Sequence, residues 1–318
     1  MPDSLLSLLA NNATTASSYT SMHPAISNFW FLIAIILATF VVSTATGNYS
    51  QVDRLWSITP IFFVANYAIV ASLRGFAVNA RLVVMSVLVL FWGCRLTFNF
   101  ARKGGYRWKD EDYRWPYLRG IITNPVLWHL FSFFFICAYQ NMLLYLITLP
   151  AKTAFDAVVE GGGAWSVVDT VALILFVGLL VLETVADQQQ WNFQETKWGM
   201  IKEGKKLEDL PAPYNVGFLT TGLFAFSRHP NFFAEFSQWW ALYLFSIGAN
   251  GQWNPEAIVG TVLLTLLFLG SAPFTEYITV QKYPLYLEYQ KKVSMLIPWI
   301  PLREPLVAAV PAPEKEHV

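Results

Sequence analysis

The polar segment Ser227–Glu235 leads directly into a long apolar stretch. Pro230 suits the first turn of a helix, because the N–H that proline lacks would have no partner there. Asn231, Glu235 and Gln238 then share one face of that helix, at spacings of i, i+4 and i+7. A carboxylate is costly to desolvate at membrane depth, so this stripe predicts a functional site rather than a neutral surface.

A purely structural role for the same segment is the alternative. Arg228 and His229 would then lie at lipid headgroups, while Asn231 caps the helix and Glu235 favours its dipole. That role does not explain Gln238 on the same stripe. We therefore favour a binding site.

Similar polar stripes occur at the ends of other apolar segments. They comprise Glu183, Asp187, Gln190 and Gln194; Arg95, Asn99 and Arg102; and Asp53 with Arg54. Unpaired charges at this depth would be costly, so we expect a shared cavity with mixed donors and acceptors. Interfacial snorkelling is the alternative, and we accept it for Arg102.

The elements that must position these residues are apolar helices. The chain is 55% hydrophobic and only 13% charged, which is too apolar for an ordinary soluble domain. Long apolar runs predict an all-α, polytopic membrane protein with about seven transmembrane helices. They are Phe29–Ala45, Ile58–Leu73, Leu82–Phe98, Val126–Leu149, Val167–Val185, Phe232–Ile247 and Ala257–Leu269. We expect one membrane domain over residues 29–301, between a polar tail at 1–28 and a cytosolic tail at 302–318.

Charge asymmetry predicts the orientation. Seventeen of the 21 Lys and Arg residues fall on one side of the expected spans. The positive-inside rule places that side, with the C-terminus, in the cytosol and the N-terminus outside. The loop Lys103–Arg119 on the cytosolic side mixes bases, acids and aromatic residues. It could order over an anionic ligand or contact anionic lipid headgroups.

Several classes of function are disfavoured. A net charge of zero argues against nucleic acid as a partner. No His, Cys, Asp or Glu set has the spacing of a metal site, so we expect none. The sequence has neither a G-x-G-x-x-G nor a Walker motif, so a nucleotide would have to be held by helix ends and side chains.

Four motifs together resemble an integral-membrane family related to the steroid 5-alpha-reductase C-terminal domain. Ser227–Glu235 resembles its S-R-H-P-N-Y-F-G-E signature, and Val52–Trp56 resembles V-D-x-x-W-G. Ala186–Gln190 resembles A-D-x-Q-K, and Ser294–Trp299 resembles the terminal T-S-x-F-I-P-W. The resemblance covers residues 51–301.

The resemblance implies a seven-helix bundle with a cytosol-facing NADPH cavity. It implies hydride transfer to a carbon–carbon double bond of a lipid-soluble substrate that enters from the bilayer, in the endoplasmic reticulum. The expected cofactor contacts are Arg95, Asp187, Gln194, Arg228, His229, Asn231 and Glu235. Arg228 and His229 would bind phosphate or ribose, assisted by the helix start at Pro230.

This sequence departs from the family pattern at informative positions. Gln190 and Gln194 replace two lysines, which removes two possible phosphate-binding cations. Trp92 stands where the steroid reductases have a tyrosine that polarises the substrate carbonyl, and an indole donates only through its N–H. Asp53 and Trp92 are therefore the expected catalytic residues, with Asp53 polarising the substrate through a raised pKa.

Two other functions remain open. Isoprenylcysteine carboxyl methyltransferases share a similar R-H-P helix start and an ending that Glu288–Pro298 partly resembles, and they bind S-adenosylmethionine. Asp53 and Asp187 favour the reductase, because the methyltransferase resemblance stops at the C-terminal third. The third possibility is a non-catalytic lipid-binding membrane protein.

Overall fold

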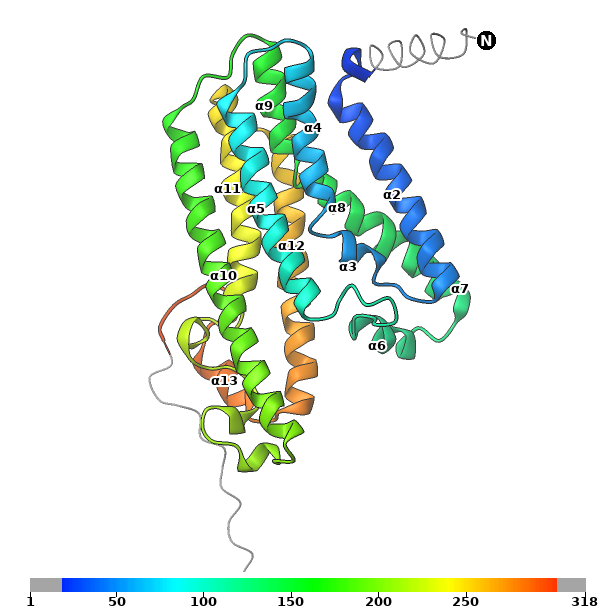
Figure 1. Cartoon of the computed structure of the whole chain (residues 1–318), viewed down its shortest axis with the longest axis vertical. Helices are drawn as coiled ribbons and strands as arrows, with labels where there is room; N and C mark the ends of the chain where they lie inside the picture. The colour runs from blue at the N-terminus through cyan, green and yellow to red at the C-terminus, as the bar shows by residue number, and fades with distance from the viewer. Residues whose placement is uncertain (1–18, 302–318) are drawn as a thin grey trace, which may run out of the picture. The chain divides into compact units, whose positions relative to one another are not determined.

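The computed structural model describes residues 19–301, and the regular structure in this part of the chain is helical (Figure 1). The longer helices are α2 (Pro24–Thr46), α4 (Thr59–Leu73), α5 (Ala80–Arg102), α10 (Val167–Lys202), α11 (Pro230–Asn250) and α12 (Pro255–Lys282). The shorter ones are α3 (Gln51–Leu55), α6 (Arg114–Ile121), α7 (Pro125–Phe131), α8 (Gln140–Leu146), α9 (Leu149–Val159) and α13 (Tyr286–Lys292). The tails expected at 1–28 and 302–318 lie outside the described residues, except for residues 19–28.

Six helical stretches within residues 19–301 are long and apolar enough to cross a membrane, which indicates a multi-pass membrane protein. They are Pro24–Thr46, Gln51–Leu73, Ala80–Arg102, Pro125–Val159, Val167–Lys202 and Pro255–Lys282. The expected count of about seven and the expected orientation are not confirmed. The remaining expected segment corresponds to α11, whose Asn231, Glu235 and Gln238 dilute its apolar character.

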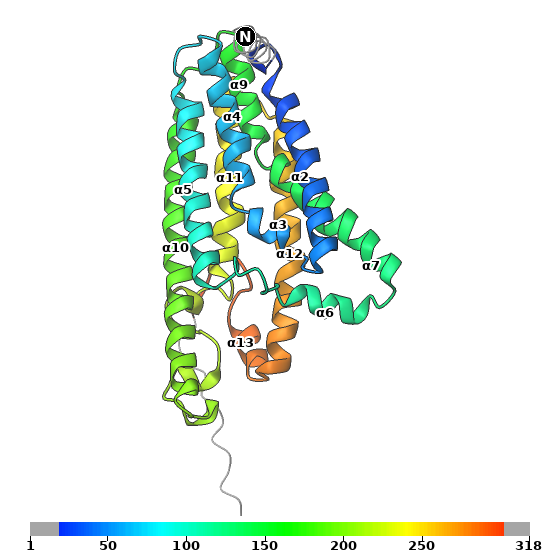
Figure 2. The same cartoon turned by 45° about the vertical axis from the view of Figure 1, so that its right-hand side comes forward.

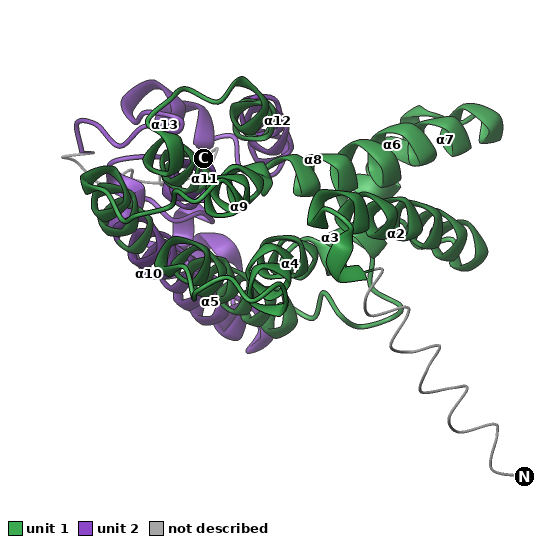
Figure 3. Cartoon of the chain, turned by 90° about the horizontal axis from the view of Figure 1, so that it is seen from above, with its two compact units in different colours: residues 1–177, 239–264 green, residues 178–238, 265–318 purple. Residues whose placement is uncertain are grey.

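The chain divides into two compact units, coloured separately in Figure 3. Unit 1 contains residues 19–177 and 239–264, and unit 2 contains residues 178–238 and 265–301 of the described chain. Helices α10, α11 and α12 each contribute residues to both units.

Side-chain caps begin several helices of unit 1. The His23 ring accepts the N–H of Ala25 before Pro24 opens α2, and Asn79 accepts the N–H of Leu82 at the start of α5. These caps satisfy donors that have no partner inside the helix. Helices α4 and α5 lie side by side along their length (Figures 1 and 2).

The fourth apolar segment is not the single helix expected over Val126–Leu149. It consists of α7, the π-helix η1 (Ser132–Tyr139), α8 and then α9. Pro150 occupies the first turn of α9, where its missing N–H has no cost, so the chain starts a new helix there. The apolar run therefore continues to Val159 through a break that hydropathy alone does not reveal.

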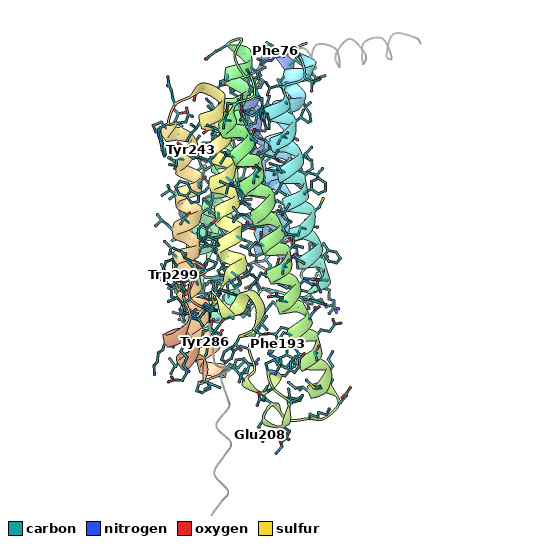
Figure 4. The ribbon with its side chains drawn as sticks, turned by 90° about the vertical axis from the view of Figure 1, so that its left-hand side faces the viewer. Phe76, Phe193, Glu208, Tyr243, Tyr286 and Trp299 are labelled. Carbon is teal, nitrogen blue, oxygen red and sulfur yellow. The ribbon has the colours of Figure 1, made fainter. Side chains whose placement is uncertain are left out.

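Two aromatic and aliphatic clusters hold unit 2 together. Ala186 and Phe193 of α10 pack with Leu219 and Phe224 of the segment before α11. Around α13, the core residues are Val216, Phe218, Tyr286, Tyr289 and Val293. Figure 4 labels Phe193, Tyr286 and Trp299 of this unit. These clusters surround the part of the chain that carries most of the expected site.

Candidate functional site

In unit 2 the polar stripes of α10 and α11 face each other. The side-chain amide of Asn231 donates to a carboxylate oxygen of Asp187 at 3.3 Å. Gln238 donates to a carboxylate oxygen of Glu183 at 2.5 Å. Asn231 and Gln238 lie two turns apart on α11, Asp187 and Glu183 lie about one turn apart on α10, and each amide of α11 meets an acid of α10. The sequence predicted both stripes, and the structure pairs them.

These acids and amides lie inside unit 2. Asp187 is 8% exposed, Glu235 is 5% exposed and Gln238 is fully buried. Gln238 donates to the carbonyl of Ala234 as well as to Glu183, but within residues 19–301 its own side-chain oxygen has no hydrogen-bond partner. A buried acceptor without a donor carries a desolvation cost, so this position favours a ligand or water that supplies an N–H or O–H.

Glu276 of α12 is the centre of a second cluster. Its carboxylate accepts two hydrogen bonds from the Arg228 guanidinium, from Nε at 2.6 Å and from Nη2 at 3.0 Å. The His229 ring lies 3.0 Å from the same carboxylate, and the Gln290 side chain donates to it at 2.7 Å. Arg228 also donates to the Gln290 carbonyl at 3.0 Å. The carboxylate is thus surrounded by donors.

Tyr286 completes the cluster around Glu276. Its hydroxyl is 3.4 Å from a carboxylate oxygen of Glu276. Burial raises the pKa of the Tyr286 phenol above its ordinary value, and the negative charge of Glu276 raises it further. The phenol therefore stays protonated and can donate.

The polar segment before α11 is also held by its backbone. The N–H of Arg228 donates to the Ser294 carbonyl at 2.8 Å, and the N–H of His229 donates to the Met295 carbonyl at 3.1 Å. The Ser227 hydroxyl donates to the Leu296 carbonyl at 2.7 Å. Two motifs that are far apart in the sequence, Ser227–Glu235 and Ser294–Trp299, are therefore hydrogen-bonded to each other.

These contacts bear on the phosphate-binding role expected for Arg228 and His229. Both side chains bind Glu276, so a phosphate would have to compete with a carboxylate that is already in place. The role stays a prediction. Sequence reasoning missed Glu276, because it lies alone beyond Pro273 in the last apolar run and its partners are distant in the chain.

Further along α10, the buried cation Lys197 follows the end of the expected polar stripe. Gln194 is half-buried, and Lys197 one turn later is 1% exposed. The Lys197 ammonium donates to the Gly217 carbonyl at 2.7 Å and lies over the ring of Tyr283, 5.3 Å from its centroid. Lys197 thereby fixes the segment that leads into α11.

The expected catalytic Asp53 belongs to unit 1, where it holds the loop Lys103–Arg119. Its carboxylate accepts the indole N–H of Trp115 at 2.8 Å and a guanidinium N–H of Arg114 at 3.2 Å. Burial would lower the pKa of Arg114, but the charges of Asp53 and Asp112 raise it above its ordinary value. Asp53 thus has an ion-pair partner, and its role as a proton donor stays a prediction.

Trp92 and Arg95 also lie in unit 1, on α5. Trp92 is fully buried and meets the ring of Trp239 edge-on, with 4.9 Å between the ring centroids. Arg95 is half-buried, one turn further along the helix. The structure therefore brings Asp187, Arg228, His229, Asn231 and Glu235 into one unit, while Asp53, Trp92 and Arg95 belong to the other.

Residues 19–301 contain no group of three or more His, Cys, Asp or Glu side chains that could hold a metal ion. The polar side chains described above for unit 2 include amides, carboxylates, an Arg–His pair, the Tyr286 phenol and the Lys197 ammonium. This set suits a neutral or hydroxyl-bearing organic group better than a cation bound by ligands alone.

Comparison with known proteins gives a family. The family described as "Protein of unknown function (DUF1295)" matches residues 39–293, which contain every expected site residue of both units. The chain is similar to a Schizosaccharomyces pombe protein named "Uncharacterized protein C594.04c", with 36% identity over 308 residues. That match covers 92% of this chain and 84% of the yeast protein. No solved structure matches the chain. The match over most of its length means that the chain belongs to the DUF1295 family.

Proposed function

We propose that this membrane protein is an NADPH-dependent reductase of a carbon–carbon double bond in a lipid-soluble substrate, related to the steroid 5-alpha-reductases. One observation carries the proposal. Asp187 and Asn231, which the motif resemblance assigns to the cofactor, are hydrogen-bonded to each other inside unit 2. They come from separate motifs more than 40 residues apart. NADPH would supply the hydride when bound.

The residues present fit one end of such a cofactor better than the other. Asn231 and Gln238 offer amide groups, Asp187 and Glu235 offer carboxylates, and all suit hydroxyl and carboxamide groups. The unpartnered side-chain oxygen of Gln238 is where a donor is missing. The phosphates fit less well, because Glu276 already binds both Arg228 and His229.

The apolar setting of the chain supports a lipid-soluble substrate. Six apolar stretches within residues 19–301 can span a bilayer, so a lipid-soluble substrate can reach the protein through the membrane. The endoplasmic reticulum is the location that the family resemblance implies.

Thermal unfolding of the purified full-length protein tests the cofactor. A ligand that binds only the folded state stabilises it by mass action, by about 2.7 kcal/mol at a hundredfold excess over Kd. We expect NADPH to raise the unfolding temperature. Stabilisation by S-adenosylmethionine instead would identify a methyltransferase, and a response to neither ligand would leave lipid binding.

Three variants localise the effect. Asn231→Ala and Glu235→Ala are expected to abolish stabilisation by NADPH while the protein still folds. Asn192→Ala is the matched control, because Asn192 is an exposed amide on α10 whose side chain accepts a hydrogen bond from Gln188, one turn away. If the Asn231 and Glu235 variants respond to NADPH as the parent does, the site is elsewhere.

A further inference from the structure

The loop Lys103–Arg119 of unit 1 contains both acidic and basic residues. Two of its acids are paired with bases inside the unit, while other bases stay exposed. Glu111 pairs with Arg119, and Asp112 accepts a hydrogen bond from Arg114 at 2.7 Å. Glu111 also accepts the backbone N–H of Tyr49 at 2.8 Å. These two acids are half-buried and already bonded within unit 1, so they do not offset the outer charges of the loop.

The turn at residues 105–110 is held from its inner side. The Arg54 guanidinium donates to the carbonyls of Gly105, Arg107 and Asp110, at 3.3, 3.1 and 3.1 Å. Asn48 donates to the carbonyl of Trp108 at 3.2 Å. Because these carbonyls bond to buried donors, the turn is held on its inner side, and the side chains of residues 107–110 are exposed.

The side chains left outside are basic and aromatic. Lys103, Arg107, Trp108 and Lys109 are all exposed, and we call them the basic surface. Trp108 is 61% exposed, while the Arg54 guanidinium lies 5.3 Å from its ring centroid and steadies it. The nearest carboxylate to Arg107 is that of Asp110, at 3.9 Å between two largely exposed side chains. Such a pair contributes little, so the surface stays positive.

The basic surface also lies at a definite point along the chain. It begins at Lys103, directly after the apolar stretch Ala80–Arg102 that can span a membrane. Exposed Trp and Tyr side chains are typical of the boundary between bilayer and water. Clustered Lys and Arg beside a spanning helix attract anionic headgroups.

We propose that the basic surface of unit 1 binds the headgroups of anionic phospholipids in the bilayer that the protein spans. The ammonium and guanidinium groups contact the phosphate and carboxylate groups of the lipid, and Trp108 inserts its free ring face at the headgroup level. This proposal is independent of the cofactor proposed for unit 2.

Native mass spectrometry of the full-length protein tests it, with phosphatidylserine and phosphatidylcholine offered separately in a neutral detergent. We expect the parent to retain phosphatidylserine in preference. The double variant Arg107→Gln/Lys109→Gln should lose about tenfold or more in phosphatidylserine affinity, since each base near the surface contributes measurably to attraction. High salt should weaken the binding of the parent.

Matched variants distinguish binding at the basic surface from a general effect of the protein's positive charge. Lys205→Gln/Lys206→Gln removes two exposed bases from unit 2 and should leave retention unchanged. Arg107→Lys/Lys109→Arg keeps the charge and should retain the lipid. Equal retention by the glutamine variant and the parent would overturn the proposal, as would an equal loss in the control. Displacement of the lipid by millimolar inorganic phosphate would overturn it too, by identifying a free-phosphate site.

Discussion

Arg81 in unit 1 and Arg228 in unit 2 each bind a buried carboxylate from a distant part of the chain, but their surroundings differ. Arg81 makes two bonds of 2.7 Å to Asp169 and donates to the carbonyls of Ala164 and Gly248. Both side chains of that pair are fully buried. The remaining partners are the two carbonyls on Arg81 and, on Asp169, the backbone N–H and hydroxyl of Ser166 directly before α10, which gives the pair a structural role.

The cluster in unit 2 is instead built from side chains. His229, Gln290 and Tyr286 share the Glu276 carboxylate with Arg228. The Arg81–Asp169 pair therefore joins α5 to α10 and to the carbonyl of Gly248 on α11. The Arg228–Glu276 pair holds the motif that leads into the candidate site. Of these two buried ion pairs, the one at Glu276 is therefore the candidate for a functional role, because side chains of the motif gather around it.

The largest expected effect follows from breaking the pair in unit 1. Arg81→Met leaves the Asp169 carboxylate buried without its cation, which should cost about 3–5 kcal/mol of folding free energy. Thermal unfolding in detergent measures it. Arg81→Met/Asp169→Leu should recover most of the loss, because apolar replacement of a whole buried pair is often nearly neutral. No recovery in the double variant would contradict a simple ion-pair role.

A smaller loss is expected in unit 2. Glu276→Gln removes the charge but leaves Arg228 its two carbonyl acceptors, Gln290 and Val293, so the cost should be about 2–3 kcal/mol. Hydrogen exchange of the Arg228 and His229 amides should also speed up, since these N–H groups donate to the carbonyls of Ser294 and Met295. Glu288→Gln, on the exposed side of α13, is the control, with an expected change within about 0.5 kcal/mol.

A substitution at Gly248 tests the position of the Asp169 side chain by steric contact. A Cβ on Gly248 would lie 2.5 Å from a carboxylate oxygen of Asp169, so Gly248→Ala must displace that side chain. We expect a cost of about 1–3 kcal/mol in thermal unfolding. Gly270→Ala has no neighbour within 4 Å and should be neutral or slightly stabilising.

The smallest effect depends on pH. Burial and then the Glu276 charge raise the folded-state pKa of Tyr286 above its ordinary value of 10.0. The stability linked to this phenol is therefore fully present below pH 10 and is lost as pH rises beyond the unfolded pKa. Unfolding measured from neutral to strongly alkaline pH should show a gentler alkaline decline for Tyr286→Phe. Tyr277→Phe, at an exposed position of α12, should decline as the parent does.

Most helices could be predicted from apolar runs, because a span needs enough apolar residues to cross the bilayer. Breaks inside a run could not, as the π-helix η1 and the new helix at Leu149 show. Neither changes the average hydropathy of the segment. Helix α11 was predicted as a span, but it is not among the six apolar stretches. The polar stripe that marks a candidate site there also lowers the apolar character of the helix.

The candidate site was predictable where residues share a local spacing. The stripes holding Asp187 and Asn231 have helical periodicity, and the structure joins them. Glu276 has no such signal, because its partners Arg228 and Gln290 are reached only through folding. Asp53 was recognised from its motif, but its bonds to Arg114 and Trp115 depend on how the following loop folds back.

The interleaving of the two units along the chain restricts how the gene can be divided. A truncation after Val177 would remove residues 239–264, which belong to unit 1, together with all of unit 2. A fragment that starts at Gly178 would retain unit 2 but carry an orphaned stretch of unit 1 within it. Coexpressed halves would have to reassemble both cores at once, so activity is best mapped with point substitutions in the intact polypeptide.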